Sequence, residues 1–290
     1  MFVIIGFAIV LIMVFGGFTL AGGKFALILK AAPTELMMIF GAAVGAFVIG
    51  NSMLVIKKTM SALGSIMKGE KWKSDDYKDL LGLLFVLTKT MRSKGVVAVE
   101  AHIENPEESK IFQYFPNVSK DHHVVEFICD YMRMMTMNFD NPHQMEDAME
   151  KDLERHHAEE HEPQHALQTM ADGLPALGIV AAVLGIIKTM GSINAPTDVL
   201  GKMVGGALVG TFLGVFLAYA LVGPLASRLN QILTEEGRFF DVIKVVIIAY
   251  LNKNPPQIAI EIGRRNVPTH MQPEFMELEE FLGDLPPDLA

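Results

Sequence analysis

Residues 171–224 read ADGLPALGIVAAVLGIIKTM, then GSINAPTDVLGK, then MVGGALVGTFLGVFLAYALVGP. The last block holds 20 consecutive residues without a charge, Met203 to Val222, which is enough to cross a bilayer as a helix. The first block offers an uncharged run of only 15, Gly173 to Ile187, which is short for a lipid-facing helix. The two blocks predict a transmembrane hairpin whose first arm is enclosed by an assembly or begins below the membrane.

The returning arm of this hairpin is rich in small residues. Gly206, Gly210, Gly214 and Ala218 recur every four positions and so form one ridge along a helix. In lipid, helices associate through close backbone approach, which glycine and alanine permit. The ridge is explained either by packing within one chain or by contact with a neighbouring subunit. We retain Gly206, Gly210 and Gly214 as candidate subunit-packing residues.

The composition predicts a membrane protein. The chain has 290 residues, of which 51% are hydrophobic, and a mean hydropathy of +0.33. Uncharged runs at Met1–Gly23 and Leu36–Ile56 add two spans, and neither run carries an ionisable group. The net charge of −9 argues against a nucleic-acid partner. We therefore expect an all-α integral membrane protein with four transmembrane helices and a large helical cytoplasmic insert.

Four segments follow from this reading. They are a first transmembrane hairpin (1–56), a cytoplasmic helical domain (57–170), a second hairpin (171–224), and a cytoplasmic C-terminal helix with an acidic tail (225–290). Five lysines follow the second span, at positions 57, 58, 68, 71 and 73. The positive-inside rule places them, and both termini, in the cytoplasm.

Turn and cap residues mark helices in the polar segments. Lys94-Gly95 predicts a helix end, and Asn105-Pro106 and Asn141-Pro142 predict helix starts. The helix from Asn141 is expected to run past Pro163 into the third span, and no strand pattern is present. Glutamates and aspartates from Glu274 to Asp288 predict a solvated or disordered tail.

One motif suggests an enzyme. His157, Glu160 and His161 match H-x-x-E-H, a zinc-peptidase pattern, with His156 and His165 nearby. The surrounding run is polar on all sides, with no apolar wall to exclude water, and an exposed helical face explains it better. We predict no catalytic residue, no metal site and no enzyme.

The four uncharged runs contain no Asp or Glu. An ion path normally needs an ionisable or strongly polar group at membrane depth. The chain offers hydroxyls instead, on Thr211 and Tyr219, although a membrane threonine commonly bonds its own backbone. If this chain conducts ions, a second protein is expected to supply the carboxylate.

The two-plus-two arrangement of spans resembles the MotA family of flagellar stator subunits. The resemblance covers nearly the whole chain and rests on short motifs: VFGG (14–17), IENPEES (103–109), LPALGIVAA (174–182), VGTFLG (209–214), GPLA (223–226), EIGR (261–264) and FMELEE (275–280). It implies a pentamer in the bacterial inner membrane around a dimer of a MotB-type, peptidoglycan-anchored subunit. It also implies that proton flow drives torque on the rotor switch protein FliG, with no cofactor beyond the transported proton.

The resemblance also implies residue roles. Arg92 and Glu100 match the rotor-contacting charges, and Lys89 and Lys94 flank Arg92. Residues matched to the ion path and its coupling are Pro175, Ala182, Thr211, Tyr219 and Pro224. Ala182 falls where sodium-driven relatives carry threonine, which favours protons.

Several rivals stay open at this point. They are a sodium-driven stator, an energiser of outer-membrane transport of the ExbB and TolQ kind, a membrane metallopeptidase and a passive scaffold.

Overall fold

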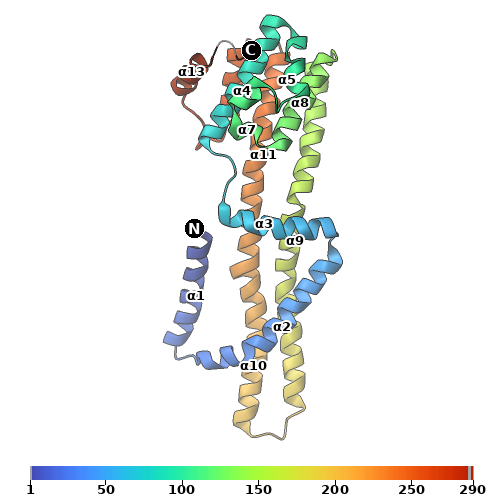
Figure 1. Cartoon of the computed structure of the whole chain (residues 1–290). Coiled ribbons are helices and arrows are strands. Elements are labelled where there is room, and N and C mark those ends of the chain that lie inside the picture. Colours follow the sequence, from blue (N-terminus) through green and yellow to red (C-terminus); the bar gives the residue numbers. More distant parts are fainter. Residues whose placement is uncertain (1, 287–288, 290) are drawn as a thin grey trace. The chain divides into compact units, whose positions relative to one another are not determined.

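The computed structural model describes residues 2–286 and 289, and Asp288 of the expected acidic tail lies outside them. Within these residues every regular element is helical, as predicted. The elements are α1 (Phe2–Leu20), α2 (Phe25–Gly50), α3 (Met53–Lys68), α4 (Ser74–Lys94), η1 (Val96–Val99), α5 (Glu100–Glu104), α6 (Lys110–Tyr114), α7 (Pro116–Ser119), α8 (His122–Thr136), α9 (Pro142–Met190), α10 (Thr197–Phe216), the π-helical η2 (Leu217–Val222), α11 (Gly223–Leu251), α12 (Pro256–Asn266) and α13 (Phe275–Gly283) (Figure 1).

The chain divides into two units. The membrane unit comprises residues up to Gly69 together with Glu160–Ile232, and the globular unit comprises Glu70–Glu159 together with the residues from Leu233 onward. The long helices α9 and α11 contribute residues to both units.

Four helices among the described residues are long and apolar enough to cross a membrane, which confirms the expected number. They are Val3–Leu20, Phe25–Gly50, Pro142–Met190 and the continuous Thr197–Leu251. None of the Val3–Leu20 window is buried by the rest of the chain, and Ile12 and Met13 are exposed. An apolar surface of this size needs lipid or a partner to cover it.

The second span differs from its predicted bounds of 36–56. Helix α2 begins at Phe25, continues through Pro33, and ends at Gly50, where Asn51 Nδ2 donates to Phe47 O at 2.8 Å. The prediction that neither N-terminal span carries an ionisable group is therefore wrong, because Lys30 and Glu35 lie inside α2. The helix is longer than the uncharged run used to predict it. A proline and two charged residues do not end a membrane helix that neighbouring helices support.

Residues that were expected to end the second span instead begin α3. Ser52 caps this amphipathic helix by accepting a hydrogen bond from Val55 N at 3.3 Å. Lys58 of α3 pairs with Glu160 of α9 at 3.4 Å, where the two helices cross in Figure 1.

The globular unit is built around α4. Its apolar residues are buried on nearly all sides, because α6, α7, α12 and α13 all contact it. Trp72 stacks on Phe239 with ring centroids 3.9 Å apart and planes at 9°. The predicted end of α4 is confirmed: Gly95 follows the helix at φ 88°, a conformation that favours glycine. The apolar stretch at 245–249 is packed in this core rather than forming a fifth span, since Val246 and Ile247 are fully buried.

One of the two predicted helix starts is correct. Asn141 Oδ1 accepts hydrogen bonds from His143 N at 3.1 Å and Gln144 N at 3.2 Å, and α9 runs from there to Met190. The start at Asn105 is wrong, because Asn105 O accepts from Glu108 N in a turn and the next helix begins only at Lys110.

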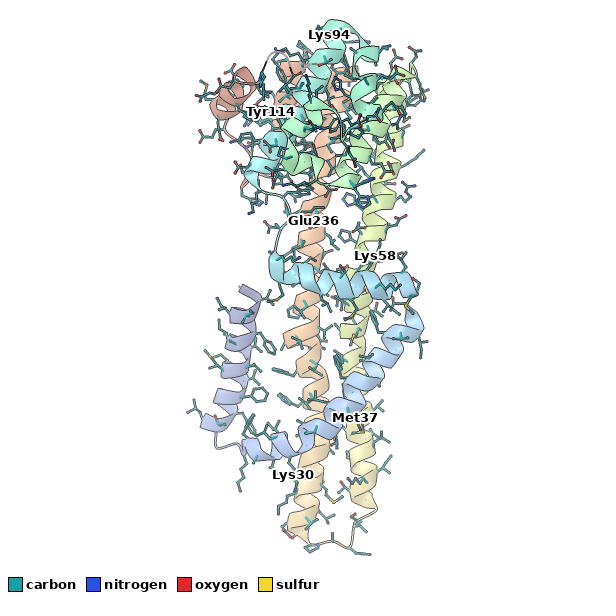
Figure 2. All side chains as sticks on the ribbon, in the orientation of Figure 1. Lys30, Met37, Lys58, Lys94, Tyr114 and Glu236 are labelled. Atoms are coloured by element: carbon teal, nitrogen blue, oxygen red, sulfur yellow. The ribbon has the colours of Figure 1, made fainter. Side chains whose placement is uncertain are left out.

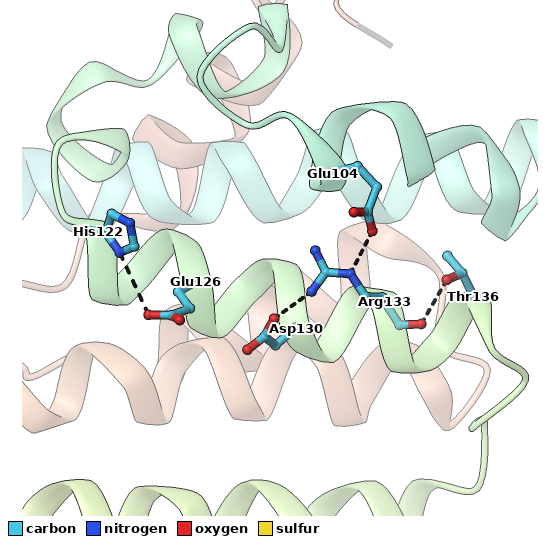
Figure 3. Close-up of polar contacts among 6 residues, drawn as sticks. All are labelled: Glu104, His122, Glu126, Asp130, Arg133 and Thr136. Carbon is cyan, nitrogen blue, oxygen red and sulfur yellow. Dashed lines mark hydrogen bonds and ion pairs between the residues drawn. The ribbon is translucent and has the colours of Figure 1, made fainter.

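Helix α5, which carries Glu100, is held to α8 by charge. Arg133 Nε donates to Glu104 Oε1 at 2.6 Å, and its Nη1 donates to Asp130 Oδ1 at 2.6 Å (Figure 3). A guanidinium shared between two carboxylates gives short, directional bonds that fix the end of α5.

Candidate functional site

The predicted hairpin is formed by α9 and α10, whose backbones approach very closely. A Cβ added to Gly214 would lie 2.7 Å from both Gly178 Cα and Leu174 O. Closer to the loop, a Cβ on Gly185 would lie 2.6 Å from Ala207 Cβ. Real side chains do not tolerate such distances, so glycine is required where the two helices meet.

Three glycines of the ridge have neighbours within the chain. Gly214 lies against α9, Gly206 lies 3.9 Å from Ala31 of α2, and Gly210 lies against both α9 and α2. Their assignment to contacts between subunits stays a prediction.

Two residues matched to the ion path lie at the same level of the hairpin. A Cβ on Gly210 would lie 3.2 Å from Ala182 N, and Thr211 follows Gly210 directly. Ala182 is buried, while the Thr211 side chain is half-buried. Ala182 and Thr211 thus lie at the same level of the hairpin, and their assignment to an ion path stays a prediction.

The other three matched residues lie further along the two helices. Pro175 is close to the Leu174 carbonyl that meets Gly214, whereas Pro224 lies beyond η2. Tyr219, within η2, is 73% exposed and lies eight residues beyond Thr211. The role of Tyr219 in the ion path stays a prediction.

A π-helical segment precedes Pro224, and the sequence analysis did not predict it. Gly223 N donates to Ala218 O, five residues back, instead of to the residue four back. Proline has no N–H, and in an α-helix its ring collides with the carbonyl four residues before it. The wider π turn over Leu217–Val222 relieves that collision, so Pro224 explains the local geometry.

Glu35 of α2 is the polar residue that sequence reasoning missed. It is 6% exposed, its Oε2 has no hydrogen-bond partner among the described residues, and it reaches the level of Ala182 and Gly210. The sequence pattern that could have indicated its burial is a spacing of four residues. Glu35, Ile39 and Ala43 are the buried residues of α2 and share one helical face.

The candidate rotor surface lies in the globular unit. It consists of four exposed charged residues, at the end of α4 and the start of α5: Lys89, Arg92, Lys94 and Glu100. Arg92 Nη1 donates to Asn254 O at 3.5 Å, and Figure 2 shows Lys94 at the end of α4. Burial, and then the charge of Lys94, lower the pKa of His102 on the adjoining helix. The surface therefore combines three cations and one anion, with a histidine of lowered pKa beside them.

The zinc-peptidase motif has no matching geometry. Among residues 2–286 and 289, no group of three or more His, Cys, Asp and Glu side chains is placed to hold a metal ion. The ring of His157 instead packs against the Cα of Gly237, on α11.

Comparison with known proteins decides the family. The model for the N-terminal region of motility protein A matches residues 4–95, and the model for the MotA/TolQ/ExbB proton channel family matches residues 120–241. The chain is 38% identical to motility protein A of Escherichia coli over 282 residues, covering 97% of this chain and 95% of that protein. The chain belongs to the motility protein A family.

Other relatives agree with this membership. Chemotaxis protein LafT of Vibrio parahaemolyticus is 37% identical and covers 97% of this chain and 98% of its own length. The fold is similar to C. jejuni MotAB, with a TM-score of 0.72, 18% identity, and coverage of 92% and 95% of the two chains. It is also similar to the flagellar MotAB stator complex of Bacillus subtilis, with a TM-score of 0.65, 21% identity, and coverage of 89% and 92%. The resemblance read from the sequence motifs is thereby confirmed.

Proposed function

We propose that this chain is the membrane subunit of a flagellar stator, which couples proton flow across the bacterial inner membrane to torque on the rotor. The observation that carries the proposal is the similarity to motility protein A, which extends over 97% of the chain. The four spanning candidates and the match to the motility protein A N-terminal model favour a stator over an energiser of the ExbB and TolQ kind.

The chain acts with a MotB-type subunit that has one span and a peptidoglycan anchor. The similar structures are MotAB complexes, which supports this partner. Five copies of this chain surround a dimer of the partner, and the uncovered apolar surface of α1 faces lipid. Both termini lie in the cytoplasm, and the loop at Gly191–Pro196 lies outside.

The partner supplies the acid that carries the proton. Protonation of its aspartate changes the charge opposite α9 and α10 by one unit, and burying such a charge at membrane depth costs several kcal/mol. This difference biases the ring between two arrangements. Ala182 and Thr211 lie beside the passing proton, while Pro175 and Pro224 are the positions where the helices bend. The π-helical turn before Pro224 supports that role, since such turns are frequent at functional sites.

Torque reaches the rotor through Lys89, Arg92, Lys94 and Glu100, which contact FliG. Exposed charges attract a partner over a distance without locking onto it, because each exposed pair contributes little binding energy. A surface of this kind suits a partner that must move past it.

Charge reversal tests the rotor contact. We expect Arg92→Glu to abolish swimming while the protein still reaches the membrane and co-purifies with the B subunit. The matched control is Lys151→Glu, which reverses an exposed charge of the same unit on α9 and should leave swimming unchanged. Normal torque in the Arg92 variant, measured on tethered cells, would remove the rotor-contact role.

Ion identity is tested by the driving force. Swimming should persist without sodium and stop when a protonophore collapses the proton gradient. If swimming depends on sodium instead, the transported ion is sodium rather than the proton, and the proposed stator function is unaffected.

A further inference from the structure

A carboxyl group lies buried in the membrane unit, at Glu35, directly before the uncharged run that begins at Leu36. Glu35 is 6% exposed, and its Oε2 has no hydrogen-bond partner among the described residues. It starts the buried stripe of α2 that continues with Ile39 and Ala43. An ionisable residue inside a membrane helix is costly to keep there and commonly marks a site of ion or proton movement.

The carboxyl group occupies space that Gly210 leaves open. A Cβ on Gly210 would lie 2.5 Å from Glu35 Oε2, 3.2 Å from Ala182 N and 3.3 Å from Ala181 Cβ. Glu35 therefore reaches the groove where α10 meets α9, from the side that α2 covers. One turn before Gly210, Ala31 of α2 lies 3.9 Å from the Cβ position of Gly206, so the two helices stay in contact there.

Among the described residues, the stretches that surround Glu35 supply no charged partner. Residues 178–186 of α9 and 206–214 of α10 contain no ionisable side chain, and neither does α1. The nearest cation along α9 is Lys188, beyond this stretch, and the cation of α2, Lys30, is exposed near the start of that helix (Figure 2).

The site lies at membrane depth. Gly210 is about 10 Å along α10 from Met203, where the uncharged run begins, at 1.5 Å of rise per residue. That distance lies well within a hydrocarbon core about 30 Å thick. Buried polar groups are nearly always hydrogen-bonded, so an unpartnered carboxyl oxygen here has unused bonding capacity.

We propose that Glu35 is a proton-binding group of this chain's own membrane wall, which takes up and releases one proton as the stator conducts. The step is the exchange of a single proton between the carboxyl group and water, and no other bond is made or broken. Because Glu35 Oε2 lies beside Gly210, at the point where Gly210 meets the Ala182 backbone, its charge changes the packing of α9 on α10 beside Thr211. The inference rests on the proposed stator function.

The test separates proton exchange from packing. Glu35→Gln keeps the shape and hydrogen-bonding capacity of the side chain but cannot release a proton. In proteoliposomes that contain this chain and its B subunit, we expect proton uptake to fall about tenfold, equivalent to about 1.4 kcal/mol in the barrier. Thr34→Ala, on an exposed neighbour in α2, is the control and should conduct like the wild type.

A spectroscopic measurement tests the inference even if the glutamine variant assembles poorly. In the wild-type complex, infrared difference spectra should show a carboxylic-acid C=O band that changes with pH. One component of this band should shift in Glu35→Asp, which keeps a titratable group, and should be missing in Glu35→Gln, while the component from the partner's aspartate remains.

Two results overturn the inference alone: full conduction by Glu35→Gln, or a carboxylic-acid band that is the same with and without Glu35. A wild-type complex that takes up no protons would instead overturn the proposed function. The two failures are therefore distinguishable.

Discussion

The backbones of Gly178 and Gly214 touch: a Cβ on Gly214 would lie 2.7 Å from Gly178 Cα, and a Cβ on Gly178 would lie 2.9 Å from Gly214 Cα. This contact sets the spacing of α9 and α10 where the proposed proton path passes. With no room for even one methyl group on either side, the hairpin can adjust only by moving whole helices.

Adding a single methyl group at this contact should weaken the hairpin. We expect Gly214→Ala to lower the free energy of unfolding in detergent by about 1–3 kcal/mol, because an overpacked contact forces the backbones apart. Thermal unfolding of the purified complex measures this change. Gly201→Ala, on the same helix with nothing within 4 Å of its Cβ position, is the control and should be neutral or slightly stabilising. Equal stabilities of the two variants would contradict the contact.

The π turn before Pro224 gives a second prediction. Pro224→Ala restores a backbone donor and removes the ring, so η2 can revert to a regular α-helix. We expect swimming speed to fall to about half or less, while the amount of complex in the membrane stays unchanged. Pro163→Ala, at a helix-interior proline with no π segment, should retain speed. An undiminished speed in the Pro224 variant would count against the bending role.

The aromatic stack is expected to support the globular unit. Phe239 is fully buried and contacts both Trp72 and Tyr77, with ring centroids 3.9 Å and 5.0 Å away. Phe239→Ala should cost about 3–5 kcal/mol, since it removes a ring from a packed core. The fluorescence of Trp72, the one tryptophan of the chain, reports the unfolding. Met276→Ala, at a side chain that is 70% exposed, should change stability by less than about 0.5 kcal/mol.

Acid should weaken the pair between Glu261 and Arg264. Arg264 is buried and donates two hydrogen bonds to Glu261, at 2.6 Å and 2.7 Å, and a third to Pro273 O at 2.9 Å. The hydrogen bonds from Arg264 lower the pKa of Glu261 below its ordinary value of 4.5. A lowered folded-state pKa means that the stability from this pair is present above that ordinary value and is lost as pH falls through the lowered pKa.

The pH dependence can be isolated with Glu261→Gln. The variant should be less stable than the wild type by about 1.5–3 kcal/mol near neutral pH, which is typical for hydrogen bonds to charged groups. The difference should shrink as both proteins are titrated into acid. Urea unfolding at several pH values measures it, and a difference that does not depend on pH would show that the ionised pair contributes nothing.

Helix caps and helix ends were predicted correctly where residues adjacent in the sequence determine the local structure. Asn141 caps α9 through its own side chain, and Gly95 ends α4 because its positive φ favours glycine. Asn105 carries the same cap signal as Asn141, yet it forms a turn. Ile111 and Phe112 are fully buried after this turn, so core packing outweighs the local preference there.

The sequence by itself determined an all-helical membrane protein, its four spans and its family, because hydropathy, caps and short motifs act over a few residues or are matched residue by residue. Only the tertiary structure decided that α2 continues through Pro33 and that Glu35 is buried against Gly210. The physical reason is that a charged residue beside an apolar run predicts the end of a membrane helix. Only contact with a helix distant in the sequence, here α10, shows that the side chain is buried. The space for Glu35 exists because Gly210 has no side chain, and the sequence around Glu35 gives no sign of that contact.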